Sequence, residues 1–321
     1  MQEGKDQILV VDDDANILRA VERVFHGDAD IEVLTATCAG EAMEIIARNP
    51  VPVVISDYTM PGVSGIEFLE WAKSAAPESM RILLTGCADL DVAINSINRG
   101  EVYRFISKPW NRTELRQLIR EALQKHKVVK CLKSKNETSL LSLIRTIELK
   151  DPSTKGHSER VAGYALQLAD ALGISGEERM DFKYGGLIHD CGKIGVPEAV
   201  LNKPGELTAE QRELIKQHAR WSGELAAMAG LNTRVVNIAL YHHERFNGNG
   251  YPTGLAGSRI PREARIVALA DVYDALASDR PYRKGLSHRE IAEYFLNEKG
   301  TSFDPQLTDV FIGELERTRG K

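Results

Sequence analysis

The chain has 321 residues, a hydrophobic content of 43%, a charged content of 27% and a formal net charge of −5 at pH 7. This composition is that of an ordinary globular protein, and the length favours two domains over one. No strongly basic stretch and no long uncharged apolar run stands out, which argues against nucleic acid as a partner and against a membrane span.

The spacing of the cysteines and the first residues of the chain bear on the cellular compartment that we expect for this protein. Cys38, Cys87, Cys131 and Cys191 lie far apart without CxxC spacing, so we expect them to be reduced and unpaired. The first six residues lead directly into a strand-like segment, with no cleavable leader. We therefore expect a cytoplasmic protein.

Residues 7–127 alternate regularly between short apolar runs and amphipathic stretches. The apolar runs predict buried strands at Gln7–Val11, Ile31–Ala36, Val51–Ser56, Arg81–Thr85 and Tyr103–Ser107. The amphipathic stretches predict helices at Ala15–Phe25, Gly40–Arg48, Gly65–Ala75, Leu90–Arg99 and Thr113–Lys127. Five such units specify an α/β doubly wound domain, with five parallel strands and helices on both faces.

Polar residues fall at the ends of these strands: Asp12 and Asp13, Asp57, Thr85 and Lys108. All lie at the carboxyl edge of the sheet, where open α/β folds place their sites. Three clustered carboxylates repel one another, and their hard oxygens suit Mg²⁺. We expect Asp57 to be the phosphorylated nucleophile, Lys108 to pair with the phosphoryl group and Thr85 to reorient toward it. Any one carboxylate could instead cap a turn.

The segments VVDDD, SDYTMPGVSG, LLTG and FISKPW resemble the receiver domain of two-component response regulators, over about the first 125 residues. The resemblance implies a flavodoxin-like fold, a bound Mg²⁺ and a sensor histidine kinase as phosphodonor. The receiver positions are matched by Asp12 and Asp13 as the acidic pair, Asp57 as the phospho-acceptor, Thr85 and Lys108 as the switch pair, and Phe105 as the mobile aromatic.

A connector follows, in which residues 111–150 contain no Pro or Gly and keep a helical pattern. The pattern predicts that the last helix of the first domain runs on as a linker helix over residues 126–147. A continuous helix could carry a rotation between domains, and two copies could pair as a coiled coil in a homodimer. A solvated linker helix is the alternative. The predicted domains are therefore residues 1–125 and 148–321, on either side of this linker.

From Asp151 onward the patterning is helical, with Gly and Pro gathered between the segments. Helices are predicted at Ser158–Leu172, Gly176–His189, Thr208–Ala229, Thr233–His243, Arg262–Ser278 and His288–Leu296. This pattern indicates an all-α bundle, a fold in which facing helices can hold metal ions in the core.

Among these helices is a set of imidazoles and carboxylates that folding does not require: His157, His189, Asp190, His218, His242, His243 and Asp271. A single member could be a satisfied core residue, but the set holds two adjacent doublets. Neutral imidazole suits a transition metal, and a carboxylate can bridge two cations. Two such cations can lower the pKa of a shared water and hold a phosphoryl oxygen. We therefore expect two metal centres and metal-dependent hydrolysis.

The segments GHSERV, HDCGKIGVPEAVLNKPGELTAEQ, HHERFNGNGYP, LADVYDALASDRPYR and GTSFDP resemble the HD-GYP branch of the HD superfamily, over about residues 148–310. The resemblance implies a helical hydrolase of cyclic dinucleotides, chiefly cyclic di-GMP. It also implies transition-metal ions, with iron as the first choice and Mn, Ni or Zn as alternatives.

Residue by residue, the resemblance implies two ligand sets that share Asp190. The first metal would be held by His157, His189, Asp190 and Asp271, and the second by His218, His242 and His243, with Asp190 bridging. Lys193 would contact the scissile phosphate and Arg280 would hold the substrate. The loop Gly250-Tyr251-Pro252 would shape the entrance or dock a GGDEF-type synthase, unless it is an ordinary tight turn.

Two positions depart from the family pattern. Ser153 stands where members with a third metal carry glutamate, so we expect two metals and the linear dinucleotide pGpG as product. Asn247 stands where the motif has aspartate, which weakens any ion pair that orders the loop. The expected protein is a response regulator whose receiver controls a cyclic di-GMP phosphodiesterase. The alternatives are a sensing module that hydrolyses little, or an enzyme for a related cyclic dinucleotide such as cyclic GMP-AMP.

Overall fold

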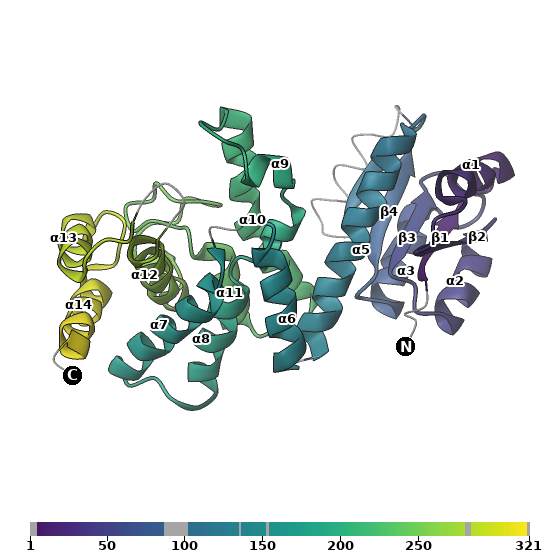
Figure 1. Cartoon of the computed structure of the whole chain (residues 1–321). Helices are drawn as coiled ribbons and strands as arrows, with labels where there is room; N and C mark the ends of the chain where they lie inside the picture. The colour runs from purple at the N-terminus through teal and green to yellow at the C-terminus, as the bar shows by residue number, and fades with distance from the viewer. Residues whose placement is uncertain (1–4, 87–101, 135, 152–153, 280–283, 320–321) are drawn as a thin grey trace. The chain divides into compact units, whose positions relative to one another are not determined.

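The computed structural model describes residues 5–86, 102–134, 136–151, 154–279 and 284–319. The chain divides into two compact units, Met1–Lys130 and Cys131–Lys321. Figure 1 draws the first unit in purple to blue and the second in teal to yellow. The division falls inside the connector, and each unit is described by itself.

The first unit is a five-stranded parallel sheet with the order β2-β1-β3-β4-β5. Its strands are β1 (Asp6–Val11), β2 (Ile31–Ala36), β3 (Val53–Asp57), β4 (Met80–Thr85) and β5 (Arg104–Ser107). Its described helices are α1 (Ala15–Phe25), α2 (Ala39–Arg48), α3 (Gly65–Ala75) and α5 (Arg112–Ser134). The predicted α/β doubly wound fold is confirmed. The helix predicted at Leu90–Arg99 lies outside the described residues.

The central strands β1, β3 and β4 are buried on both faces, which is why they read as continuous apolar runs. Leu9 and Val11 of β1 join a core cluster with Phe68 of α3. Because side chains alternate along a strand, Ile8 and Val10 point to the opposite face of the sheet. All five strands run in one direction, so the residues that follow them gather at one edge.

The connector is broken into two helices, α5 (Arg112–Ser134) and α6 (Glu137–Glu148). Asn136 has an extended backbone (φ −82°, ψ 110°), and its side-chain oxygen accepts a hydrogen bond from the N–H of Ser139. The prediction of one uninterrupted helix through residues 111–150 is therefore wrong. Asparagine competes for backbone N–H groups and favours a cap over a helix interior, so it can end a helical pattern without Pro or Gly.

The second unit is helical, as predicted. After α6 it contains α7 (His157–Ala171), α8 (Gly176–Ile188), η3 (Cys191–Gly195), α9 (Glu198–Leu201), α10 (Ala209–Met228), α11 (Thr233–Tyr241), η4 (Gly257–Arg259), α12 (Arg262–Ala277), α13 (His288–Glu298) and α14 (Pro305–Arg319). The sequence did not predict α9, α14 or the two short 3₁₀ helices.

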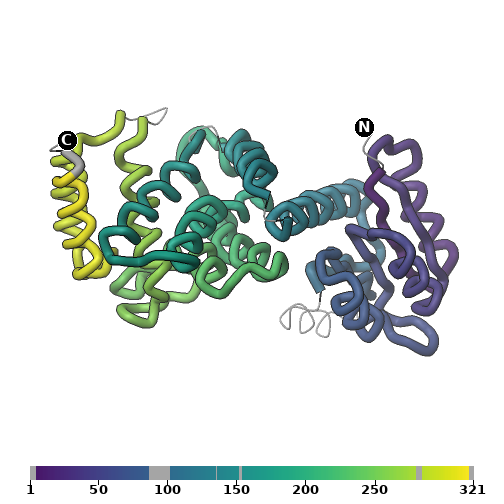
Figure 2. Tube along the Cα trace, turned by 90° about the horizontal axis from the view of Figure 1, so that it is seen from below, coloured from purple at the N-terminus to yellow at the C-terminus, as the bar shows by residue number. Residues whose placement is uncertain are grey.

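The helices α7, α8, α11 and α12 pack together, and α10 packs against α11 and η3. Figures 1 and 2 both show α13 and α14 (yellow) at one edge of this unit, where α14 packs against α7 and α12. The central part of α12 is apolar nearly all round, since Ile266, Val267, Leu269 and Ala270 are buried. This run carries Asp271 into the core.

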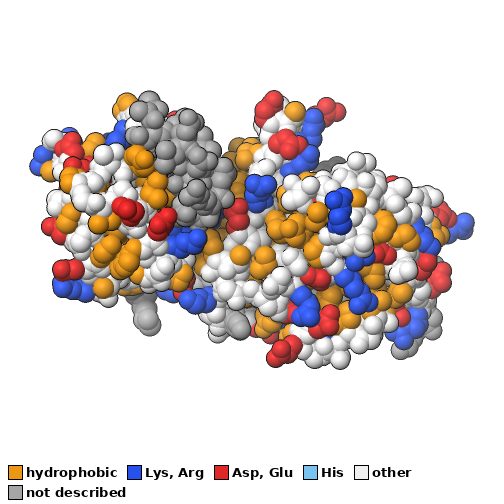
Figure 3. Space-filling model, turned by 180° about the vertical axis from the view of Figure 1, so that it is seen from behind, with side chains coloured by type: hydrophobic (Ala, Val, Ile, Leu, Met, Phe, Trp, Pro, Cys, Tyr) orange, Lys and Arg blue, Asp and Glu red, His pale blue; other side chains and the backbone are white. Residues whose placement is uncertain are grey.

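The surface of the second unit carries both charge signs. On the face drawn in Figure 3, Lys and Arg side chains alternate with Asp and Glu instead of gathering into one basic surface, as far as the described residues show. Within the described ranges, no helix has both the length and the apolar character that a bilayer span requires.

Candidate metal centre

The carboxyl edge of the first unit's sheet brings three carboxylates together. One oxygen from each of Asp12, Asp13 and Asp57 lies within 4.8 Å of the others. Lys108 Nζ lies 2.7 Å from Asp12 Oδ2 and 2.6 Å from Asp57 Oδ1. Burial raises the pKa of Asp12, although Lys108 opposes that shift. Four charged groups that the sequence predicted for this edge therefore form one cluster, the acidic cluster of the first unit.

The two remaining switch residues lie on neighbouring strands. Thr85, at the end of β4, is buried, and its hydroxyl donates to the carbonyl oxygen of Gly86 at 3.1 Å. Phe105, on β5, is partly buried against the core cluster of this unit.

In the second unit, seven side chains form two groups of ligand atoms, each within 4.8 Å. One group is His157, His189 and Asp271, and the other is Asp190, His218, His242 and His243. They come from the start of α7, the end of α8, the middle of α10, the end of α11 and the core of α12. Segments more than a hundred residues apart in sequence thus converge in one helical core.

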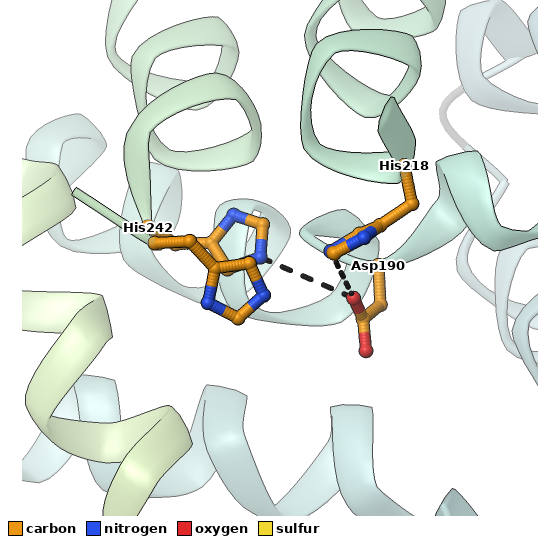
Figure 4. A group of neighbouring side chains, drawn as sticks. Asp190, His218 and His242 are labelled. Carbon is orange, nitrogen blue, oxygen red and sulfur yellow. Dashed lines mark ion pairs between the residues drawn. The ribbon is translucent and has the colours of Figure 1, made fainter. Parts of the chain in front are cut away.

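The two carboxylates lie between the groups. Asp190 Oδ1 is 3.1 Å from His218 Nε2 and 4.0 Å from His242 Nε2, and Figure 4 shows these three side chains pointing toward one another. Asp190 Oδ2 also lies 3.6 Å from His189 Nε2, in the other group. Asp271 has one oxygen 3.1 Å from His157 Nε2 and the other 4.0 Å from His243 Nδ1. Each carboxylate can therefore serve both groups.

Several of these atoms are buried without a hydrogen-bond partner, namely His189 Nε2, Asp190 Oδ1, His218 Nε2 and His242 Nε2. An unpaired buried polar atom is costly, and four that face one centre call for a common partner. Borderline transition-metal cations satisfy such a mixture of imidazole nitrogen and carboxylate oxygen. The residues therefore fit a metal centre.

The opposite ring nitrogens are occupied. His189 Nδ1 lies 2.7 Å from the Gly186 carbonyl oxygen, His218 Nδ1 2.6 Å from that of Ile215, and His242 Nδ1 3.1 Å from that of Ala239. A carbonyl oxygen can only accept, so each Nδ1 carries the proton and donates it. This leaves the Nε2 lone pair directed at the centre, as a metal ligand requires.

Burial sets the charge of most of these imidazoles. It lowers the pKa of His189 and His242, and lowers the pKa of His243 to about 3, so that the neutral, ligating form prevails. Burial would raise the pKa of Asp271, but the surrounding imidazoles, His157 first, lower it overall. The Asp271 carboxylate therefore remains ionised.

His157 differs because it has two acidic neighbours. Burial alone would lower its pKa, but hydrogen bonds with Asp271 and Asp274 raise the pKa of His157 to about 9. Its Nδ1 lies 2.7 Å from Asp274 Oδ2, and Arg160 binds Asp274 through Nε at 2.6 Å and Nη2 at 3.0 Å. Asp274 thus orients His157, a role that the sequence reasoning missed. Its position one turn after Asp271 on α12 was the available signal.

The short helix η3 brings Asp190 and Lys193 to the centre. A Cβ on Gly192 would lie 2.1 Å from the carbonyl oxygen of His218, so only glycine allows η3 to approach α10 this closely. The N–H of Gly192 donates to Ser222 Oγ at 2.8 Å. Lys193 Nζ lies 2.7 Å from Asp190 Oδ2 and 3.5 Å from Asp151 Oδ2. Lys193 therefore places a positive charge beside a carboxylate that approaches both groups.

The loop that contains Gly250-Tyr251-Pro252 lies over His243, whose ring centroid is 4.7 Å from that of Tyr251. A Cβ on Gly250 would meet the backbone of Arg245 at 2.3 Å, so the loop folds tightly onto the end of α11. Asn247 Oδ1 accepts a hydrogen bond from the N–H of Asn249 at 2.9 Å, and so retains a turn-forming role.

Glu244 anchors this loop, and the sequence reasoning missed it. Its carboxylate accepts from the N–H groups of Thr253 (2.8 Å), Gly254 (3.1 Å) and Leu255 (3.0 Å), and from the hydroxyl of Thr253 (2.7 Å). The adjacent doublet His242-His243 was the available signal. Two residues singled out from the sequence, Ser153 and Arg280, lie outside the described residues.

Two family models match the chain: the response regulator receiver domain over residues 8–120 and the HD domain over residues 142–307. The chain is 33% identical to the cyclic di-GMP phosphodiesterase response regulator RpfG of Xanthomonas campestris, over 98% of this chain and 90% of that protein. It is 30% identical to a cyclic di-GMP phosphodiesterase of Thermotoga maritima, over 97% and 90%. It is 32% identical to the 3'3'-cGAMP-specific phosphodiesterase 2 of Vibrio cholerae, over 56% and 35%.

Proposed function

Because this chain belongs to the family of response regulators that join a receiver domain to an HD domain, we propose that it hydrolyses cyclic di-GMP to pGpG under receiver control. The observation that carries the proposal is the set of buried, unpaired Nε2 and carboxylate oxygen atoms that face one centre. Nearly full-length relatives named as cyclic di-GMP phosphodiesterases support the choice of substrate.

The seven ligands would hold two transition metals, with Asp190 shared between them. When bound, such a pair supplies Lewis acidity and lowers the pKa of water. The chain's own residues provide the rest of the chemistry. Lys193 supplies a positive charge for a phosphate oxygen, and Asp274 holds His157 in its ligating orientation. Tyr251, over His243, narrows the approach to the centre. We propose iron as the native metal, which elemental analysis of protein purified without added metal would test.

The substrate is tested by incubating metal-loaded protein with cyclic di-GMP and with cyclic GMP-AMP, side by side, and following the products by chromatography. We expect cyclic di-GMP to be consumed faster and pGpG to accumulate. Faster loss of cyclic GMP-AMP would favour the second candidate, which the relatives specific for that nucleotide and the substitution at Asn247 support. Tight binding of either nucleotide without any product would overturn the enzyme in favour of a sensor.

We propose that the acidic cluster of the first unit binds Mg²⁺ and that a sensor histidine kinase phosphorylates Asp57. Lys108 and Asp12 surround the Asp57 carboxylate, as a phosphorylation site with a hard cation requires. Docking of a GGDEF-type synthase on the Gly250-Tyr251-Pro252 loop, and a homodimer formed through the connector, remain further proposals.

Replacing Asp57 with alanine should remove only the response to phosphorylation. Basal hydrolysis should stay within about twofold of the wild type, because Asp57 belongs to the first unit and contributes nothing to the metal centre. The measurement compares hydrolysis before and after treatment with a small-molecule phosphodonor and Mg²⁺. Alanine at Asp13, the exposed member of the acidic cluster, should weaken the response through Mg²⁺ and leave the acceptor in place. A phosphodonor response that survives in the Asp57 variant would exclude this residue as the acceptor.

A further inference from the structure

We propose that Glu148, the last residue of α6, is a positioning residue of the metal centre. It holds the segment that carries His157, although it lies outside both ligand groups. The inference deepens the proposed function and rests on it for the reaction that would be affected.

The first observation is a pair of hydrogen bonds on either side of His157. Glu148 Oε2 accepts from the N–H of Gly156 at 2.7 Å, and Oε1 accepts from the N–H of Ser158 at 3.0 Å. Both oxygens of one buried carboxylate are thus committed to the backbone that flanks a single ligand. Hydrogen bonds to an ionised acceptor are shorter and stronger than neutral ones.

The start of α7 lacks a cap of its own. Its N-cap residue is Gly156, which has no side chain to accept a hydrogen bond and adopts a left-handed backbone (φ 69°). The first N–H groups of a helix have no partner within the helix and attract negative charge. Glu148 supplies that charge from a different helix, so the position of His157 depends on α6.

The body of α6 is fastened to the helices that carry the ligands. Glu137, at its start, pairs with Lys183 of α8 at 2.6 Å. Arg145, near its end, pairs with Glu159 of α7 at 3.0 Å. Between them, Leu140, Ile144 and Ile147 are buried. Glu148 therefore lies at the end of a helix that is held in place by contacts with α7 and α8.

The turn after α6 contacts the short helix η3, which carries Lys193. Lys150 Nζ donates to the carbonyl oxygen of Ile194 at 3.2 Å, and Asp151 Oδ2 lies 3.5 Å from Lys193 Nζ. A small cavity beside the site is lined by residues of α6 and of the ligand segments, among them Ile147, Glu148, Ser158, Leu187, Asp190 and Lys193. These contacts join the C-terminal end of α6 to η3 as well as to the start of α7.

The test replaces Glu148 with glutamine and titrates metal-free protein with Mn²⁺, counting bound ions and measuring the affinity of each site. Glutamine keeps the size but loses the charge, and its amide nitrogen would face one of the two N–H donors. We expect the affinity of one of the two sites to fall about 10–100-fold, as is typical when a ligand's supporting partner is lost, while the other site changes little. With cyclic di-GMP, kcat should fall and KM should change little.

The matched control is Glu159→Gln, which removes the charge from another contact between α6 and α7, the ion pair with Arg145, and leaves the backbone on either side of His157 untouched. It should bind both metals as the wild type does. A merely structural role for Glu148 would weaken both sites together or lower only the melting temperature. Should Glu148→Gln fail to fold, Glu148→Asp keeps the negative charge on a shorter side chain. It should also lower the metal affinity of one site, by a smaller factor.

The inference would be overturned if each site bound Mn²⁺ as tightly in the folded Glu148 variants as in the wild type. The metal titration needs no substrate, so it separates two failures. If the wild type bound two Mn²⁺ ions but hydrolysed no cyclic dinucleotide, the proposed function would be wrong. The comparison of metal affinities between the wild type and the Glu148 variants would still test the role of Glu148.

Discussion

Replacing Asp190 with alanine is expected to abolish turnover and to deplete both metals at once. The Asp190 carboxylate approaches His218 and His242 with one oxygen and His189 with the other, so its loss affects both ligand groups. Its loss would also leave the largely buried Lys193 ammonium without its nearest carboxylate, at 2.7 Å. We expect kcat to fall at least about 10³-fold, equivalent to about 4 kcal/mol of lost transition-state stabilisation. Elemental analysis of the purified variant measures the metal loss directly.

A matched control for Asp190→Ala is Asp181→Asn, which alters another buried carboxylate of the second unit. Asp181 is bound by Asn232 and Arg234 and belongs to neither ligand group. It should cost stability, and both metals should stay bound. Full metal content with measurable turnover in Asp190→Ala would refute the bridging role, and loss of only one metal would reassign Asp190 to a single site.

The sequence was most informative where one local feature determines the structure. Strand β1 could be located because burial on both faces requires a continuous apolar run. The residues now grouped with Asp190 stood out because imidazoles and acids at such positions serve no purpose in folding. Their convergence was visible only through helix periodicity and resemblance, since His157 and Asp271 are more than a hundred residues apart.

The sequence was least informative about residues that act through the backbone. Glu148 and Glu244 are glutamates that accept hydrogen bonds from N–H groups 8 to 11 residues away, and neither periodicity nor composition indicates such partners. The break before α6 was missed for a related reason. Asn136 interrupts the helix by capping the start of α6, and this cap leaves the spacing of the apolar residues unchanged.

Lys193→Met is expected to lower kcat/KM about 10²–10³-fold while both metals remain bound, the range typical of losing one electrostatic contact to a developing charge. Methionine keeps the length of the side chain and removes its charge. Lys193 Nζ now lies 2.7 Å from Asp190 Oδ2, so its removal takes away a cation that competes for that oxygen. Metal affinity should therefore stay the same or rise. Steady-state kinetics and elemental analysis on one preparation would measure both quantities.

Two further variants separate the possible roles of Lys193. Lys203 lies nearby in the chain and binds Gln211 at 2.8 Å, so Lys203→Met controls for the loss of a lysine outside the metal centre. Lys193→Arg keeps the positive charge and should recover part of the activity if the ammonium acts on the phosphate. If Lys193 only oriented Asp190, the methionine variant would lose metal as well as activity, and arginine would restore the metal first. The order in which metal and activity return therefore decides between contact with the substrate and support of a ligand.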